Sequence, residues 1–201
     1  MDARVCCLPP LMGLDLTMVS NLLTCTEIEW LTHIPFEKSS EFSRYRILGA
    51  NGIILLSIPV KKHVRGAFLH EIEIDYNQNW RHQHWRSIES AYGKSPFFNH
   101  FREDLAALYE SKLPFLWQFA MDWAEWLIKI YTKSNRIPVK MTRNLLPLQP
   151  EGVLQLSYKL ALRTSEIDFR YQQVFGKEFV PGLSVLDHLF CAGPKFWNLQ
   201  N

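Results

Sequence analysis

The apolar residues of this chain change their spacing near Asn77, and the change separates a strand-forming half from a helix-forming half. Before it, Tyr45–Val60 (YRILGANGIILLSIPV) holds two β-rich runs around Asn51-Gly52. Asn-Gly between apolar runs is the strongest short signal of a β-hairpin, because both residues tolerate positive φ. The next apolar segment alternates strictly, as a strand does. We therefore predict a three-stranded antiparallel meander with strands at Arg44–Leu48, Ile53–Ile58 and Leu69–Asp75.

After Asn77 the apolar residues recur at helical spacing. Trp80–Tyr92 is predicted to form a helix with a continuous apolar face, which Gly93 and Pro96 end. The other predicted elements are helices at Phe101–Leu113, from Pro114 onward, at Ser165–Phe175 and at Leu183–Gly193, a short strand within Arg136–Thr142, and a covering loop at Asn144–Gly152. The expected fold class is α+β, as a single domain over residues 1–201, with a small antiparallel sheet from the N-terminal half packed with four or more helices.

Charge and composition exclude several classes of partner. The formal net charge is +2, too balanced for a protein that binds the phosphate backbone of nucleic acid. No stretch reaches the roughly 20 apolar residues that a membrane span requires. The four cysteines, Cys6, Cys7, Cys25 and Cys191, show no CxxC spacing and are interpreted as reduced thiols of a cytoplasmic protein. The oligomeric state stays open.

Two histidines of the Trp80–Tyr92 helix point in different directions. At about 100° per residue, His84 falls on the apolar face with Trp80, whereas His82 faces water. His84 is a candidate general base, because histidine titrates near neutral pH. The competing interpretation is a buried, hydrogen-bonded core residue. No metal site is expected, because zinc needs three or four converging ligands.

Positive charge gathers near the first predicted hairpin. Lys38, Arg44 and Arg46 suit a pyrophosphate or a carboxylate, although charged strand edges also occur simply to prevent aggregation. His188 and Cys191 stand three residues apart on one predicted helix and are a weaker candidate for a nucleophile pair. The chain has no glycine-rich phosphate loop, no GxSxG and no HExxH.

Three segments, in this order, resemble the WbqC-like family, whose members are associated with bacterial O-antigen and other surface-polysaccharide gene clusters. The segments are HIPFEKSSEFSRYRILGANGIILLSIPV, NWRHQHWRSIESAYGKSPFF and YQQVFGKEFVPGLSVLDHLFCAGP. The matching residues are Lys38, Arg44, Ile47, Pro59 and Val60 in the first, Trp80, His84, Tyr92 and Pro96 to Phe98 in the second, and Leu183, Ser184, Asp187, Leu189, Phe190, Gly193 and Pro194 in the third. The chain departs from the family pattern at Ile34, Ser43 and Cys191.

The resemblance implies an aminoacyl (glycine) transferase that forms an amide on an amino sugar or nucleotide sugar. It implies His84 as the base and Asp187 as the residue that orients it. Substrate contacts are assigned to Lys38, Arg44, Arg46, Trp80, Tyr92 and Ser184. No cofactor is expected, and the partner is a small molecule, either a nucleotide sugar or an aminoacyl donor. The alternatives are a non-catalytic binding or scaffold protein of a polysaccharide locus, and a hydrolase that uses Cys191.

Overall fold

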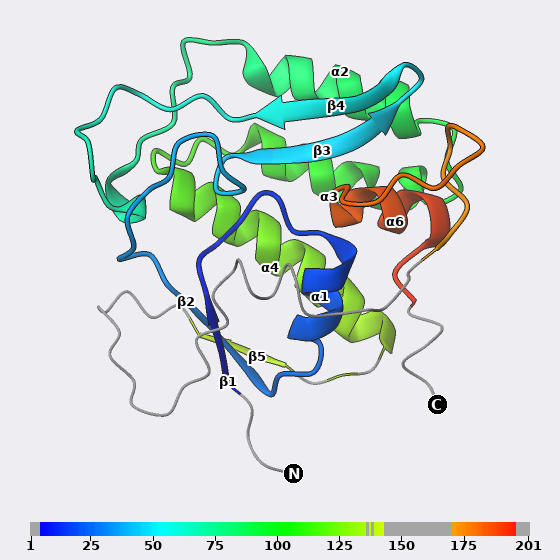
Figure 1. The fold of residues 1–201 in the computed structure, drawn as a ribbon, viewed down its shortest axis with the longest axis horizontal. Coiled ribbons are helices and arrows are strands. Elements are labelled where there is room, and N and C mark those ends of the chain that lie inside the picture. The colour runs from blue at the N-terminus through cyan, green and yellow to red at the C-terminus, as the bar shows by residue number, and fades with distance from the viewer. Residues whose placement is uncertain (1–4, 136, 138, 143–169, 196–201) are drawn as a thin grey trace.

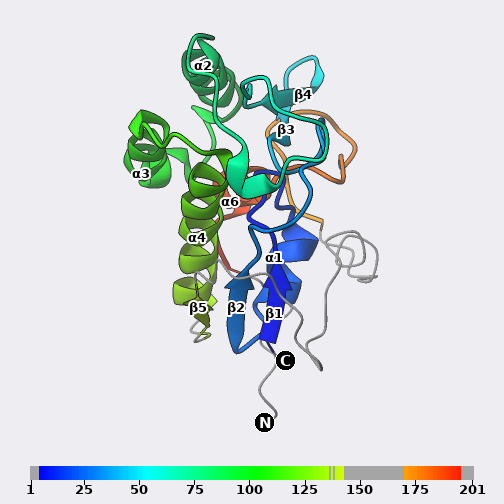
Figure 2. The same ribbon diagram turned by 90° about the vertical axis from the view of Figure 1, so that its left-hand side faces the viewer.

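The computed structural model describes residues 5–135, 137, 139–142 and 170–195. Its helix α2 spans Trp80–Tyr92, so the bounds predicted from the apolar spacing are confirmed. The other helices are α1 (Leu16–Leu22), α3 (Phe98–Glu110), α4 (Leu116–Asn135) and α6 (Val185–Ala192). Helix α4 runs through the centre of the molecule, and α2, α3 and α6 lie around its upper half (Figures 1 and 2). None of the described helices is long and apolar enough to cross a bilayer.

The predicted hairpin is present as β3 (Arg44–Gly49) and β4 (Gly52–Ser57), paired antiparallel. Its inner face, which includes the buried Tyr45 and Ile47, packs against the helices. Its outer face carries Arg44 and Arg46 on β3, opposite Ser57 and Leu55 on β4. Figure 2 shows the hairpin with helices on one side only. The alternation of side chains along a strand thus separates a structural face from a face that a ligand can reach.

The prediction of a third strand at Leu69–Asp75 is wrong. Leu69–Glu71 forms a 3₁₀ helix, and only single bridges, Val60 to Ile74 and Glu73 to Phe115, remain of the expected pairing. Leu69 and Ile72 are both fully buried and stand three residues apart, which is the period of a 3₁₀ turn. The apolar residues of this segment fit either the alternation of a strand or burial at every third residue. Packing against the rest of the protein favours burial at every third residue, and the segment forms a 3₁₀ turn.

The structure also contains a parallel sheet that the sequence analysis missed. Its strands are β1 (Val5–Leu8), β2 (Glu27–Trp30) and β5 (Lys140–Thr142), in the order β1-β2-β5. Only β5 falls within a predicted strand. Helix α1 connects β1 to β2, and Asp15 caps it by accepting a hydrogen bond from the Met18 amide at 2.8 Å. The fold is therefore α+β, with an antiparallel pair and a separate parallel sheet.

The expectation that all four cysteines are reduced is wrong. Cys6 on β1 and Cys25, two residues before β2, form a disulfide. The parallel pairing of Val5 with Glu27 brings the two cysteines together, which sequence spacing could not show. The disulfide removes the argument from cysteines for a cytoplasmic location. Cys7 and Cys191 are free.

The helix predicted at Leu183–Gly193 is present as α6 (Val185–Ala192). Helix α6 begins after Ser184, whose hydroxyl accepts a hydrogen bond from the Leu186 amide, and it ends at Gly193, which has φ 82°. The part of the predicted Ser165–Phe175 helix that the structure describes, residues 170–175, is not helical, and the remainder lies outside the described residues. The predicted loop Asn144–Gly152 also lies outside them.

Candidate functional site

The structure separates the predicted site residues into three groups. Arg44, Arg46 and Ser184 line one recess on the outer face of the hairpin. His84 and Trp80 lie in the core on the inner face, and Asp187 and Tyr92 form a second buried group. Lys38 is exposed and stands next to Ser39 of the recess, but does not itself line it. The substrate assignments of Arg44, Arg46 and Ser184 thus share one location.

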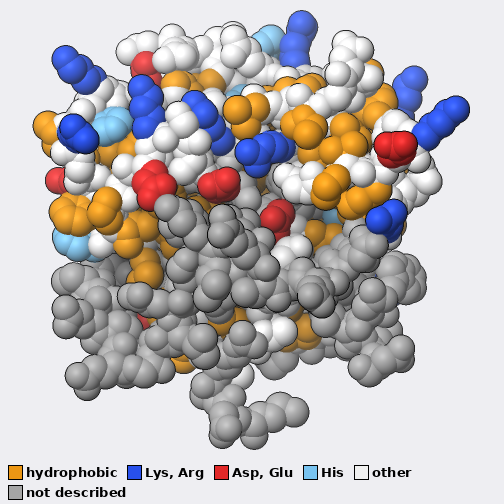
Figure 3. Space-filling model, viewed as in Figure 1, with side chains coloured by type: hydrophobic (Ala, Val, Ile, Leu, Met, Phe, Trp, Pro, Cys, Tyr) orange, Lys and Arg blue, Asp and Glu red, His pale blue; other side chains and the backbone are white. Residues whose placement is uncertain are grey.

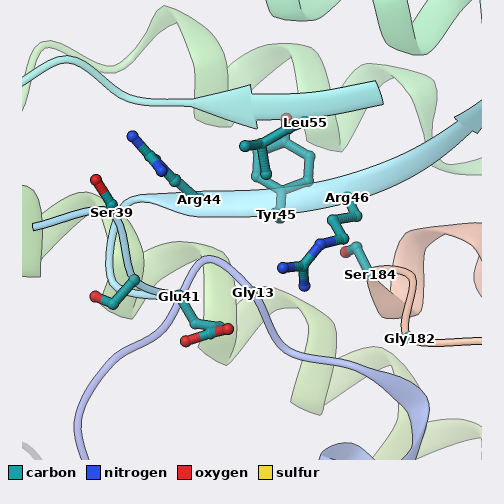
Figure 4. Close-up of a pocket in the computed structure, with 10 residues that line it drawn as sticks. Gly13, Ser39, Glu41, Arg44, Tyr45, Arg46, Leu55, Gly182 and Ser184 are labelled. Carbon is teal, nitrogen blue, oxygen red and sulfur yellow. The ribbon is translucent and has the colours of Figure 1, made fainter. Parts of the chain in front are cut away.

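The recess has a volume of about 70 Å³. Its lining comes from four parts of the chain: Gly13, Ser39 to Glu41, the strands at Arg44 to Arg46 and Leu55, and Gly182 with Ser184. Figure 4 shows Arg44 turned toward Ser39, and Arg46 turned toward Glu41 and Ser184. Arg44 and Arg46 both line the recess together with Ser39, Ser40 and Ser184, and in Figure 4 their guanidinium groups extend in different directions from β3. The size of the recess, about that of two water molecules, suits a single carboxylate or phosphate group.

Backbone contacts hold the walls of the recess together. The Ser184 amide donates to the carbonyl of Arg46 at 2.8 Å, which places the start of α6 beside β3. The Gly13 amide donates to the carbonyl of Glu41 at 3.0 Å. A methyl group at Gly13 would lie 2.8 Å from the Arg44 carbonyl and from the Glu41 side chain, so only glycine permits this approach. Sequence reasoning missed Gly13 because its partners are distant in the chain.

Two further residues of the recess have unusual backbone conformations. Gly182 has φ 70°, which glycine adopts freely. Ser39 also has φ 70°, a left-handed conformation that costs a residue with a side chain about 1–2 kcal/mol. Such strain persists where the surroundings impose it, and it gathers at functional sites. The local sequence does not predict this conformation, because serine does not favour positive φ as glycine and asparagine do.

The electrostatics of the recess favour an anion. Among the described residues, no carboxylate lies within 4 Å of a guanidinium nitrogen of Arg44 or Arg46. Arg44 donates through Nε to the hydroxyl of Ser57 at 3.3 Å, and its other nitrogens make no hydrogen bond to the residues that the structure describes. The face in Figure 3 carries Lys and Arg side chains mainly over its upper part, where the hairpin lies in Figure 1. Glu41 is the only described acid that lines the recess.

His84 lies on the inner face of the hairpin and is only 3% exposed. Its Nε2 donates to the carbonyl of Ser57 at 3.1 Å, and its Nδ1 lies 3.4 Å from the hydroxyls of Tyr45 and Tyr109. Those two hydroxyls also hydrogen-bond each other. Burial lowers the pKa of His84 to about 4, so the ring is neutral at pH 7. In this conformation the ring has no access to the recess.

Asp187 is completely buried, and its side-chain hydrogen bonds to described residues go to partners other than His84. A joint role of the two side chains at a shared ligand stays a prediction. The Oδ1 of Asp187 accepts from the hydroxyl of Tyr92 at 2.7 Å. Its Oδ2 accepts from the hydroxyl of Tyr171 at 2.7 Å and from Nε2 of Gln173 at 3.0 Å. These three donors compensate the carboxylate for the water that it loses on burial. The residue thus orients Tyr92 and the segment before α6.

The His188–Cys191 pair does not form an activated nucleophile. Burial, with a smaller effect from Asp187, raises the pKa of the Cys191 thiol to about 12, whereas an activated thiol needs a lowered pKa. The Nδ1 of His188 is 2.8 Å from the hydroxyl of Tyr131. Within the described part of the chain, no three His, Cys, Asp or Glu side chains are grouped so as to hold a metal ion.

Comparison with known proteins identifies a family. The model of the family described as the WbqC-like protein family matches residues 20–164, which is more than half of the 201 residues. This range includes the hairpin and helices α2 to α4, and it ends before α6. No curated protein and no solved structure matches the chain.

Replacement of His84 by alanine is expected to lower the free energy of unfolding by about 2–4 kcal/mol, because it leaves a cavity and removes the hydrogen-bond partner of buried groups. His82→Ala is the matched control, since His82 is exposed on the same helix. We expect it to change stability by less than about 0.5 kcal/mol. Chemical unfolding of both variants measures the difference. Equal stability of the two would contradict the core role of His84.

The buried histidines also predict a loss of stability in mild acid. Burial lowers the pKa of His84 and of His188 to about 4, below the unfolded value of about 6.5. Between these values the unfolded chain binds protons that the folded chain does not, so stability falls as the pH falls from about 6.5 toward 4. Between pH 7 and pH 5, the free energy of unfolding of His84→Gln should fall by about 2 kcal/mol less than that of the unmodified protein. His82→Gln should keep the original pH dependence, and an unchanged slope in both variants would refute the assignment.

Proposed function

The chain belongs to the WbqC-like protein family, and from this premise we propose that its recess binds the anionic group of a small-molecule substrate in surface-polysaccharide biosynthesis. The observation that carries the proposal is the pair Arg44 and Arg46, which line one recess with no carboxylate of the described residues close enough to pair with them. Arginine binds carboxylates and phosphates through charge-assisted hydrogen bonds.

The size of the recess limits what it holds. Sites that enclose a whole drug-sized ligand have volumes of about 300–1,000 Å³. A recess of about 70 Å³ holds one charged group and leaves the rest of the ligand on the open surface of the hairpin. The diphosphate of a nucleotide sugar suits this arrangement, with one phosphate in the recess and the other next to Arg44 or the exposed Lys38.

We propose aminoacyl transfer to an amino sugar as the reaction, with an activated aminoacyl ester or thioester as donor. The amine nitrogen attacks the carbonyl carbon, a C–N bond forms, and the bond to the alcohol or thiol leaving group breaks. Glu41 is the proposed base that takes the amine proton and passes it to the leaving group. It replaces His84 in this role because Glu41 lines the recess and His84 is buried.

A non-catalytic binding protein is the second candidate. The observation that favours it is the burial of His84, whose two ring nitrogens are both engaged by neighbouring groups. A binding protein needs the arginines of the recess but has no need of a proton acceptor. The two candidates therefore differ in the expected effect of replacing Glu41.

Inorganic pyrophosphate is a direct probe of the recess. Arg46→Gln should weaken its binding at least about tenfold, since a hydrogen bond to a charged group contributes about 1.5–3 kcal/mol. Arg65→Gln, which removes one charge from a different exposed loop, should change the affinity less than about twofold. Isothermal titration of each variant measures the affinities. Equal losses in both variants would show general attraction to a basic surface and would contradict a site at the recess.

The same preparations distinguish the two candidates. Mass analysis of a mixture of aminoacyl donor and nucleotide amino sugar detects any amide product. If transfer is the function, Glu41→Gln retains pyrophosphate binding and loses the product. Binding without product in the unmodified protein would instead establish the non-catalytic candidate.

A further inference from the structure

Strand β4 has an outer edge on which the backbone groups of Ile53 and Leu55 have no partner among the described residues, whereas the carbonyl of Ser57, at the end of the strand, accepts from His84. In an antiparallel pair, the residues alternate between pairs that exchange hydrogen bonds and pairs whose amide and carbonyl groups point away from the partner strand. On β3, the amide of Leu48 donates to the hydroxyl of Tyr92 at 3.2 Å, and the carbonyl of Arg46 accepts from Ser184. Arg46 and Leu48 therefore point their backbone groups away from β4.

The register of the hairpin shows which residues of β4 also point their backbone groups outward. Ile53 is opposite Leu48, and Leu55 is opposite Arg46, so both must point their amide and carbonyl groups away from β3. No hydrogen bond joins these groups to any of the described residues. The side chains of Ile53 and Leu55 are 53% and 50% exposed, on the outer face. The edge thus offers an unpaired backbone together with apolar side chains, which is the arrangement that accepts an added strand.

A groove runs beside this edge. It has a volume of about 440 Å³ and is lined by the hairpin from Gly49 to Ile54 and by Arg86, Ser87 and Ser90 of α2. Figures 1 and 2 show α2 beside the hairpin, and its His84 and Tyr92 side chains reach Ser57 of β4 and Leu48 of β3. Arg86 is exposed, and no carboxylate of the described residues pairs with it. A strand added at this edge would have one face beside Ile53 and Leu55 and its opposite face beside Arg86.

We propose that this groove binds an extended peptide segment with apolar side chains on one face and acidic side chains on the other. The apolar side chains would lie beside Ile53 and Leu55, and an acidic one would pair with Arg86. Cross-strand apolar neighbours and backbone hydrogen bonds would supply the affinity, and the charge would supply the specificity. The proposal does not depend on the function of the recess.

Charge argues against a second copy of the chain as the occupant. A symmetric β4–β4 pairing centred on Ile54 would place the two copies of α2 on the same side of the joined sheet. The two Arg86 side chains would then face each other, and like charges brought together oppose association. A peptide that carries carboxylates meets the same arginine favourably.

The test uses fluorescence anisotropy with a labelled peptide of about six alternating valine and aspartate residues, capped at both ends. We expect saturable binding that Ile53→Lys weakens at least about tenfold, because a lysine on an edge strand blocks strand addition. Val64→Lys is the matched control. Val64 is 75% exposed and lies outside the groove, and its replacement should change the affinity less than about twofold. Methylation of the peptide amides that face β4 should abolish binding.

Three results would overturn the proposal. They are absence of saturable binding, equal binding of the amide-methylated peptide, and equal or tighter binding of a peptide in which lysine replaces aspartate. Sedimentation equilibrium of the protein alone provides the fourth check. A dimer that Ile53→Lys dissociates and Val64→Lys does not would assign the edge to a second copy. Circular dichroism of each variant establishes that it is folded before binding is measured.

Discussion

The buried carboxylate of Asp187 connects the parts of the chain on which the recess depends. Removing a carboxylate from water costs several kcal/mol even in a relaxed protein interior, so its hydrogen-bond partners must be held in place. The hydroxyl of Tyr92 donates to Asp187 and accepts from the Leu48 amide of β3. Burial, together with the nearby carboxylate, raises the pKa of Tyr92, so this hydroxyl stays a donor. Helices α2 and α6 and strand β3 are thereby fixed relative to one another.

The other oxygen of Asp187 organises the segment before α6. Tyr171 and Gln173 donate to it, and Gln173 also bonds both backbone groups of Val180. This fixes the route of the chain toward Gly182 and Ser184, which form one wall of the recess. The residue that the family resemblance implies as a catalytic partner of His84 thus shapes the recess from behind. The arginines that line the recess and the buried His84 lie on opposite faces of one hairpin.

Local patterns predicted the elements that local forces determine. The apolar face of Trp80–Tyr92, the first hairpin and the Ser184 cap each lie within one short segment, and all three are confirmed. The turn of the hairpin lies at Ala50-Asn51, however, and Gly52 is already the first residue of β4. The parallel sheet was missed because strands of three or four residues carry little pattern, and their partners are far apart in sequence. The third strand was wrong because alternation alone does not reveal burial at every third residue.

In the candidate site, too, local features were predictable from the sequence, and contacts between distant segments were not. Arg44 and Arg46 stand two residues apart on a strand and therefore share a face, and the structure places Ser184, which the family resemblance implies as a substrate contact, beside them. The partners of His84 and Asp187 depend on tertiary packing, because each is surrounded by tyrosines from distant parts of the chain. Gly13 and Glu41 entered the site only through contacts between loops.

The most direct test of this account is the free energy of unfolding of Asp187→Asn, with Asp104→Asn, at an exposed position of α3, as its control. The asparagine keeps the shape of the side chain but replaces an acceptor oxygen by a donor, which disrupts the bonds from Tyr171 and Gln173 or from Tyr92. We predict that Asp187→Asn lowers the free energy of unfolding by about 2–3 kcal/mol and that the control changes it by less than about 0.5 kcal/mol. Equal stability of the two variants would contradict the role of this carboxylate as the anchor of the recess.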